Sequence, residues 1–256
     1  MKAVILAGGL GTRMREETEF KPKPMVEVGG KPVLWHIMKI LGHQGITEFI
    51  ICTGYKGEMI KRYFFDYGAM SQDFSVTLGR PDEVQFHGDH AEFGWRVTVA
   101  DTGPNTLTGG RIRAIEKYLD GEDFLITYGD GIANIDLKAL LARHAELGST
   151  LTLTTTQPQS RFGVVEIDST GLVSKFLEKP QGDETINIGY MVAKHGVFDY
   201  LLEDGALEEK PLRELASAGV LGAYRHSGFW QPMDTVRESE LLNSIWNSGN
   251  VPWKSW

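Results

Sequence analysis

The stretch Lys2-Ala-Val-Ile-Leu-Ala-Gly-Gly-Leu-Gly-Thr-Arg13 predicts a buried strand that ends in a glycine-rich loop. Further along, Pro32 to Leu41 places apolar residues at three- and four-residue intervals behind a proline suited to the first turn of a helix. A second apolar run, Glu48 to Cys52, predicts another strand. Strand, helix and strand in this order form a βαβ unit, in which the two strands are parallel. We therefore expect an α/β fold.

The rest of the chain continues this alternation, with two β-rich interruptions. Phe74 to Leu78 and Trp95 to Ala100 alternate with period two and are separated by polar, Gly-containing sequence, which predicts strands around an inserted excursion. Phe162 to Ile167 and Val173 to Glu178 predict a hairpin. Further helices are expected over Gly57 to Phe65, Gly110 to Tyr118, Leu137 to Leu147 and Arg237 to Trp246, and further strands over Asp123 to Tyr128 and Ser149 to Thr155.

Composition narrows the classes of protein. Hydrophobic residues make up 41% and charged residues 23% of the 256, which is ordinary for a globular chain. The net charge of -8 disfavours a nucleic-acid partner, because such binding depends on clustered Lys and Arg. No apolar run reaches the roughly 18 residues of a membrane span, and no signal-peptide pattern precedes Gly8. With Cys52 as the single cysteine, no internal disulfide can form, and we expect a cytoplasmic protein without a membrane partner.

The glycine-rich loop is the sharpest chemical feature. Glycines directly after a strand let backbone amides converge on an anion, and two nearby cations, Arg13 and Lys23, suit phosphate oxygens. A tight strand-to-helix turn is the alternative reading of the glycines alone. The loop is not a dinucleotide-binding fingerprint, since Met14 stands where that motif has glycine, and it is not a Walker A loop, since no Gly-Lys-Ser/Thr follows. An NAD-dependent oxidoreductase is therefore disfavoured.

Several motifs in the same order resemble the sugar nucleotidyltransferase family. They span nearly the whole chain: Gly8-Gly-Leu-Gly-Thr-Arg13, Pro22-Lys-Pro-Met25, Gly129-Asp-Gly131, Phe162-Gly-Val-Val165, Glu178-Lys-Pro180, Asn187-Ile-Gly-Tyr190, and Phe229-Trp230 with Asp234. The resemblance implies a Rossmann-like mixed sheet, mainly parallel and flanked by helices, with inserted β excursions around the sugar site. We expect one domain over residues 1–256, with a nucleotide-binding part at about 1–135 and a sugar-binding part at about 136–256.

A second group of motifs resembles the branch of this family that uses CTP and glucose 1-phosphate. These motifs are Trp35-His-Ile-Met38, Thr53-Gly-Tyr-Lys-Gly57, Asp101-Thr-Gly103 and Thr108-Gly-Gly-Arg111. The product implied is CDP-glucose. The same chemistry with UTP or dTTP is one alternative, and a non-catalytic nucleotide-sugar sensor of the same fold is another. The resemblance also implies a homo-oligomer.

The implied reaction brings two anions together, so positioning and electrostatic stabilisation suffice and no protein nucleophile is required. By resemblance, Arg13 binds the triphosphate, Lys23 the α-phosphate and incoming phosphate, and Lys179 the sugar phosphate, with Lys21 as a rival for the role of Lys23. The implied nucleotide-binding set is Leu6, Ala7, Gly8, Gly9, Gly11, Thr12, Arg13, Lys23, Thr108, Gly109, Gly110, Arg111 and Asp130.

The resemblance also implies Mg²⁺ as cofactor, held by Asp130 and Asp234, because carboxylates and phosphate oxygens complete its octahedron. Asp130 has an alternative reading as a turn-former in Gly-Asp-Gly. Asp234 departs from the usual spacing after its tryptophan, which leaves Glu238 as a substitute. The implied sugar-phosphate set is Tyr128, Gly163, Glu178, Lys179, Asn187, Gly189 and Trp230.

Several histidines and tryptophans suggest other sites. His87 and His90 could ligate zinc, but no companion Cys/His pair accompanies them. His36 lies within an amphipathic helix, where a packed or a solvated side chain is favoured over a catalytic one. Near the C-terminus, three tryptophans suggest a partner surface: Trp246, Trp253 and Trp256.

Overall fold

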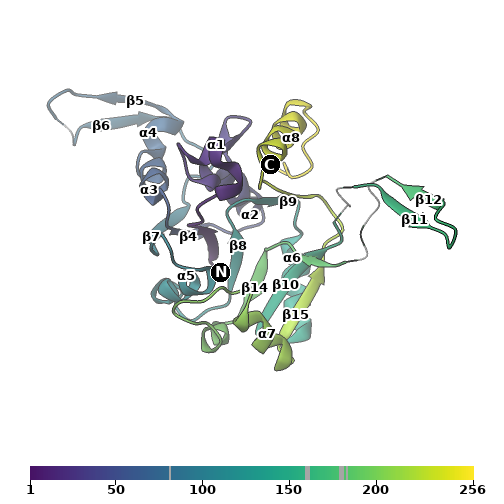
Figure 1. Cartoon of the computed structure of the whole chain (residues 1–256). Helices are drawn as coiled ribbons and strands as arrows, with labels where there is room; N and C mark the ends of the chain where they lie inside the picture. The colour runs from purple at the N-terminus through teal and green to yellow at the C-terminus, as the bar shows by residue number, and fades with distance from the viewer. Residues whose placement is uncertain (81, 159–161, 179–181, 183) are drawn as a thin grey trace.

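The computed structural model describes the chain except for residues 81, 159–161, 179–181 and 183 and the side chain of residue 15 (Figure 1). Its centre is a mixed sheet in the order β13-β10-β14-β8-β1-β4-β7, with β15 beside β10. One half of this sheet is parallel and consists of β1 (Ala3–Ala7), β4 (Glu48–Thr53), β7 (Arg96–Asp101) and β8 (Phe124–Tyr128). The predicted βαβ unit is confirmed, because β1 and β4 pair in parallel on either side of the crossover helix in sequence.

The other half of the sheet mixes directions. The strand β14 (Met191–Ala193) is antiparallel to both β8 and β10 (Leu151–Thr156). On the far side of β10, β15 (Leu221–Arg225) is parallel and β13 (Ile186–Asn187) antiparallel. The predicted α/β fold with a mixed, mainly parallel central sheet is confirmed.

Helices cover both faces of the sheet, which explains why the central strands read as continuous apolar runs. Ala3, Ile5 and Ala7 of β1 face one core, and Val4 and Leu6 face the other. The first core is closed by α2 (Val33–His43), α6 (Leu137–Leu147) and α8 (Val236–Asn247), and the second by α5 (Thr108–Ala114) and α7 (Lys210–Ser217). The remaining helices are α1 (Arg15–Thr18), α3 (Gly57–Phe65) and α4 (Tyr67–Ser71). Among the described residues, no helix is long and apolar enough to cross a membrane.

Two hairpins project from this body in different directions (Figure 1). They are β5–β6 (Asp73–Val76 and Val84–His87) and β11–β12 (Val164–Ile167 and Val173–Leu177), and all of their strand residues are exposed. The second hairpin confirms the sequence prediction. The strand predicted at Phe74 to Leu78 begins the projecting hairpin as β5. The strand predicted at Trp95 to Ala100 is confirmed as β7, which lies in the central sheet beside β4. As the edge strand it is only partly buried, and this produces the period-two pattern.

The C-terminal tryptophans pack around His36. Trp253 is 1% exposed, and Trp246, Trp253 and Trp256 have ring centroids within 6.5 Å of the His36 ring. His36 is itself buried, and its Nε2 lies 2.8 Å from the Val28 carbonyl. Burial lowers the pKa of His36 to about 4. Trp253 is therefore closed to a partner, whereas a partner surface at the partly buried Trp246 and Trp256 stays a prediction. The packed reading of His36 is confirmed.

Candidate functional site

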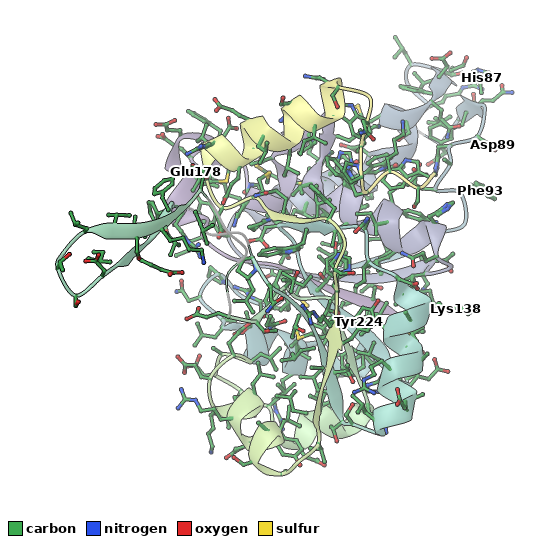
Figure 2. The ribbon with its side chains drawn as sticks, turned by 90° about the vertical axis from the view of Figure 1, so that its right-hand side faces the viewer. His87, Asp89, Phe93, Lys138, Glu178 and Tyr224 are labelled. Atoms are coloured by element: carbon green, nitrogen blue, oxygen red, sulfur yellow. The ribbon has the colours of Figure 1, made fainter. Side chains whose placement is uncertain are left out.

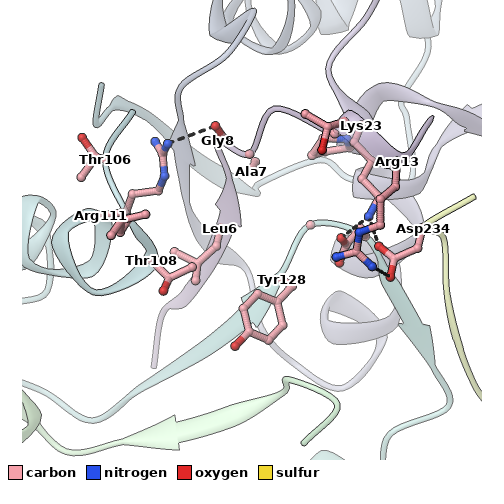
Figure 3. A pocket seen from close by; sticks show the side chains of 17 residues that line it. Leu6, Ala7, Gly8, Arg13, Lys23, Thr106, Thr108, Arg111, Tyr128 and Asp234 are labelled. Carbon is pink, nitrogen blue, oxygen red and sulfur yellow. Dashed lines mark hydrogen bonds and ion pairs between the residues drawn. The ribbon is translucent and has the colours of Figure 1, made fainter. Parts of the chain in front are cut away.

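A cavity of about 320 Å³ opens where β1 and β8 end (Figure 3). β1 and β8 are neighbours in the parallel part of the sheet, and β4 lies on the other side of β1. The order in which the chain adds strands to the sheet therefore reverses between β1 and β8. Ligands of open α/β sheets bind at such a point. The lining residues are Leu6, Ala7, Gly8, Gly9, Gly11, Thr12, Arg13, Lys23, Pro24, Thr106, Leu107, Thr108, Arg111, Tyr128, Gly129, Asp130 and Asp234.

The glycines of the first loop have different structural causes. Gly11 adopts a left-handed φ of +63°, and a Cβ there would lie 2.6 Å from the Thr18 side chain. Gly9 has nothing within 4 Å of its Cβ position and is open to a ligand. At Gly8 a Cβ would lie 2.1 Å from Nη1 of Arg111. Close approach of a phosphate is therefore not needed to explain Gly8, since the arginine already fills that space.

Arg111 acts as a buried clamp behind the loop. Its side chain donates to the carbonyls of Thr53, Gly103 and Gly8 at 2.8–3.0 Å. It also donates to Oγ1 of Thr102 at 2.7 Å, and the residue is only 4% exposed. Burial lowers the pKa of its guanidinium. Arg111 thus lines the cavity as expected, and its Nη1 and Nη2 join the three loops that contain Gly8, Thr53 and Gly103.

A cluster of two cations and two carboxylates occupies the opposite side of the cavity (Figure 3). Nζ of Lys23 lies 2.6 Å from Asp130 and 2.5 Å from Asp234, and Nη1 of Arg13 lies 2.6 Å from Asp234. Lys23 is 12% exposed, whereas Arg13 is 74% exposed. Lys21 lies elsewhere, with its Nζ 3.9 Å from Glu27. Of the two rival lysines, only Lys23 is a member of the cluster.

A short ladder brings the two carboxylates together across 104 positions of sequence. After β8, the chain turns through Gly129 and Asp130 into β9 (Gly131–Ala133), which pairs antiparallel with β16 (Trp230–Pro232). The Met233 amide donates to the carbonyl of Asp130 at 2.9 Å, which places Asp234 opposite Asp130. Glu238 forms a capping box with Thr235 at the start of α8, and accepts from the Asp234 amide. Its carboxylate holds the backbone beside Asp234.

Behind Thr108 and Tyr128, which line the remaining wall of the cavity, lies a carboxylate that the sequence motifs did not indicate. Glu208 accepts hydrogen bonds from Oγ1 of Thr108 and from the hydroxyl of Tyr128, both at 2.5 Å. Gly109 and Gly110 do not line the cavity. Their Cβ positions face the carbonyls of Gly205 and Glu203 at 2.6 and 2.4 Å. These glycines are explained by close packing against the segment that carries Glu208.

The expected sugar residues are arranged around Tyr128 and beyond the cavity. Asn187 hydrogen-bonds to Tyr128, and a Cβ at Gly189 would lie 2.8 Å from the Tyr128 ring. Gly163 and Glu178 lie at the base of the β11–β12 hairpin, with Glu178 labelled in Figure 2. Trp230 lies in β16 and does not line the cavity. Lys179 falls outside the residues that the structure describes. Tyr128 is thus the expected sugar contact that lies in the cavity itself.

The two histidines considered for zinc have other neighbours. Nε2 of His87 lies 2.8 Å from Oγ of Ser75, and the His90 ring lies 5.2 Å from that of Tyr67. Within the part of the chain that the structure describes, no three His, Cys, Asp or Glu side chains gather as a metal site. Cys52 is buried, and this burial raises the pKa of its thiol to about 12.

The donor set at Asp130 and Asp234 fits Mg²⁺ in one specific way. Mg²⁺ is commonly held by one or two carboxylates together with substrate phosphates and waters, and so needs no complete protein cage. The carboxylates of Asp130 and Asp234, which both contact Nζ of Lys23 beside the open glycine loop, supply that partial shell. The arrangement can therefore bind a phosphorylated ligand together with a divalent cation.

Comparisons with known proteins agree with this arrangement. A model of the nucleotidyl transferase family matches residues 2–229. The chain is 49% identical to the glucose-1-phosphate cytidylyltransferase of Salmonella typhi, over 100% of both chains. It is 46% identical to the probable glucose-1-phosphate cytidylyltransferase of Bacillus subtilis, again over 100% of both chains.

A solved structure shows the same architecture. The crystal structure of HddC from Yersinia pseudotuberculosis superposes with a TM-score of 0.70 at 25% identity, covering 96% of this chain and 99% of the other.

Proposed function

Since the chain belongs to the nucleotidyl transferase family, we propose that it forms CDP-glucose and pyrophosphate from CTP and glucose 1-phosphate. The observation that carries this proposal is the 49% identity, over both full lengths, to a glucose-1-phosphate cytidylyltransferase. The cavity supports it, because cations, carboxylates and an open glycine loop meet where two parallel strands end.

The proposed reaction is a direct in-line displacement. An oxygen of the sugar phosphate attacks the α-phosphorus of CTP, the bond from the α-phosphorus to the bridging oxygen breaks, and pyrophosphate leaves with that oxygen. Lys23 is proposed to stabilise the α-phosphate and the incoming phosphate, and Arg13 the triphosphate. Their ion pairs with Asp130 and Asp234 beside the cavity support these roles. Lys179 is proposed for the sugar phosphate by family resemblance. These cations offset the repulsion between the two anionic reactants.

Asp130 and Asp234 are the proposed ligands of Mg²⁺. When bound, the ion would neutralise charge on the phosphate oxygens. The nucleotide is proposed to contact the first loop and backbone groups of the segment around Thr108, both in residues 1–135. Sugar binding is proposed for residues 136–256, through Gly163, Glu178, Asn187, Gly189 and Trp230, with Tyr128 at the boundary. A cytoplasmic homo-oligomer is part of the proposal.

A panel of triphosphates tests the substrate assignment. The purified protein is incubated with glucose 1-phosphate, Mg²⁺ and CTP, UTP or dTTP in turn, while pyrophosphate release and the nucleotide sugar are measured. We expect turnover with CTP to exceed the others. Product with UTP alone would refute the base assignment but leave the reaction class intact, and pyrophosphate release with none would favour a non-catalytic sensor.

A further inference from the structure

The wall made by Thr108 and Tyr128 differs chemically from the cluster of two cations and two carboxylates across the cavity (Figure 3). Both hydroxyls donate to the carboxylate of Glu208, at 2.5 Å each. Glu208 belongs to the segment before α7, whereas Thr108 begins α5 and Tyr128 ends β8. One carboxylate therefore links side chains from three separate parts of the chain.

An inventory of hydrogens fixes what this wall can offer a ligand. A hydroxyl has one hydrogen, and Thr108 gives its hydrogen to Glu208 while accepting from the Leu207 amide at 2.8 Å. Tyr128 likewise gives its hydrogen to Glu208. Burial, reinforced by Glu208, raises the pKa of Tyr128, so that the phenol stays protonated. Toward the cavity, both oxygens can only accept hydrogen bonds.

The cavity is therefore polarised. At one side, Arg13 and Lys23 offer donors to a phosphate, beside the carboxylates of Asp130 and Asp234 that would hold Mg²⁺. At the other side, a pair of acceptors bonded to a carboxylate disfavours an anion. A sugar 1-phosphate has the matching polarity, since its phosphate is anionic and its ring hydroxyls are hydrogen-bond donors. Asn187, which contacts Tyr128, lies on the side expected to hold the sugar.

We propose that Glu208 is a positioning residue that turns Thr108 and Tyr128 into acceptors for hydroxyl groups of the sugar. In this way it orients the sugar phosphate toward Lys23. The inference rests on the proposed function, which supplies the sugar 1-phosphate as ligand. It goes beyond that function, because it assigns the direction of the substrate to a residue outside the family motifs quoted above.

Glu208→Gln separates this role from a purely structural one. Two further hydrogen bonds from backbone amides hold the segment that carries Glu208. Gly110 N donates to the Gly205 carbonyl at 3.2 Å, and Leu207 N donates to Oγ1 of Thr108 at 2.8 Å. Glu208→Gln leaves both in place and retains the size of the side chain. The amide accepts from only one oxygen and donates from its nitrogen, so one of the two hydroxyls must turn its hydrogen elsewhere.

Steady-state kinetics of Glu208→Gln test the proposal, with Glu209→Gln as the matched control. We expect the KM for glucose 1-phosphate to rise about tenfold in Glu208→Gln, while the KM for CTP changes less than about twofold. Glu209 is exposed and makes no side-chain cap to α7, so Glu209→Gln should match the wild type. An equal rise of both KM values, or no rise of either, would overturn the proposal.

Deoxy analogues of glucose 1-phosphate sharpen the test. In the wild type, removal of the hydroxyl that contacts this wall should lower kcat/KM, and in Glu208→Gln the same removal should cost several-fold less. Equal costs in both proteins at every ring position would again overturn the proposal. If no triphosphate supports turnover, the proposed function fails. Calorimetric binding of glucose 1-phosphate to the wild type and Glu208→Gln then decides the role of the wall separately.

Discussion

Two arginines of the same cavity show how burial divides a site into ligand-binding and scaffold regions. Arg13 is 74% exposed at the mouth and makes an ion pair with Asp234. Arg111 is 4% exposed beneath the glycine loop and donates to backbone carbonyls of three loops. Both terminal nitrogens of Arg111 are thus engaged by the loops, whereas the guanidinium of Arg13 is exposed to a ligand. The mouth is therefore built for binding, and the region beneath it for holding the loops.

This division predicts that substitutions at the mouth reduce activity and those beneath it reduce stability. The largest effect on activity is expected at Lys23, whose ammonium joins both carboxylates of the cluster. Lys23→Ala should lower kcat by about a thousandfold, the upper range for losing one electrostatic contact to a transition state. The measurement is pyrophosphate release, with thermal unfolding as the check on folding.

Lys21→Ala is the matched control, because Lys21 lies beside Glu27 and outside the cavity. It should retain wild-type kcat. Equal losses in the two variants would show that charge near the loop matters and position does not.

Arg111 should give the largest loss of stability. Arg111→Met retains most of the side-chain volume but removes a charged donor from the carbonyls of Gly8, Thr53 and Gly103. The Thr53 and Gly8 carbonyls keep the amides of Thr102 and Tyr55 as donors. We expect the free energy of unfolding to fall by about 3 kcal/mol, because a hydrogen bond to a charged group contributes about 1.5–3 kcal/mol and water from the cavity can replace some of those lost. Urea denaturation measures this. Arg62→Met, at a residue 85% exposed, is the control, and a loss as small as its own would contradict the clamp.

The sequence predicted those parts of the molecule whose signals are local. Both ends of α6 (Leu137–Leu147) were predicted correctly, because Asp136 caps its start and Gly148 ends it in a left-handed conformation. The three-residue strand β14 was not predicted, since it is specified by its neighbours β8 and β10, which lie far away in sequence.

The same reasoning separates the predicted from the missed parts of the site. The loop and Lys23 have motifs of their own, and the structure brings them together. The space beside Gly8 is filled by Arg111, which is 103 positions away, so the loop alone could not reveal why glycine stands there. Glu208 has no motif and reaches the site through its contacts with Thr108 and Tyr128. Contacts between residues far apart in the sequence therefore determine both the glycine at position 8 and the role of Glu208.

His36 extends the comparison to a titratable group of the interior. Its pKa is about 4 in the folded protein and near 6.5 when unfolded, so the unfolded state binds more protons between these values. Its contribution is fully present above about pH 6.5 and is lost as the pH falls toward 4, by about 3 kcal/mol in total. His36→Gln should therefore show a shallower fall of unfolding free energy over this range in urea titrations. Parallel curves for the two proteins would contradict the assignment.

Arg13 gives the smallest of these effects and the most direct test of the division. Arg13→Gln should lower kcat by about a hundredfold, the lower end of the range for one contact, because its guanidinium is largely solvated. The free energy of unfolding should change by less than about 0.5 kcal/mol, as is usual at the surface. Arg13→Lys should recover only part of the activity, since an ammonium keeps the charge but lacks the planar fork. A stability loss like that of Arg111→Met would instead make both arginines part of one scaffold, and the contrast between mouth and interior would fail.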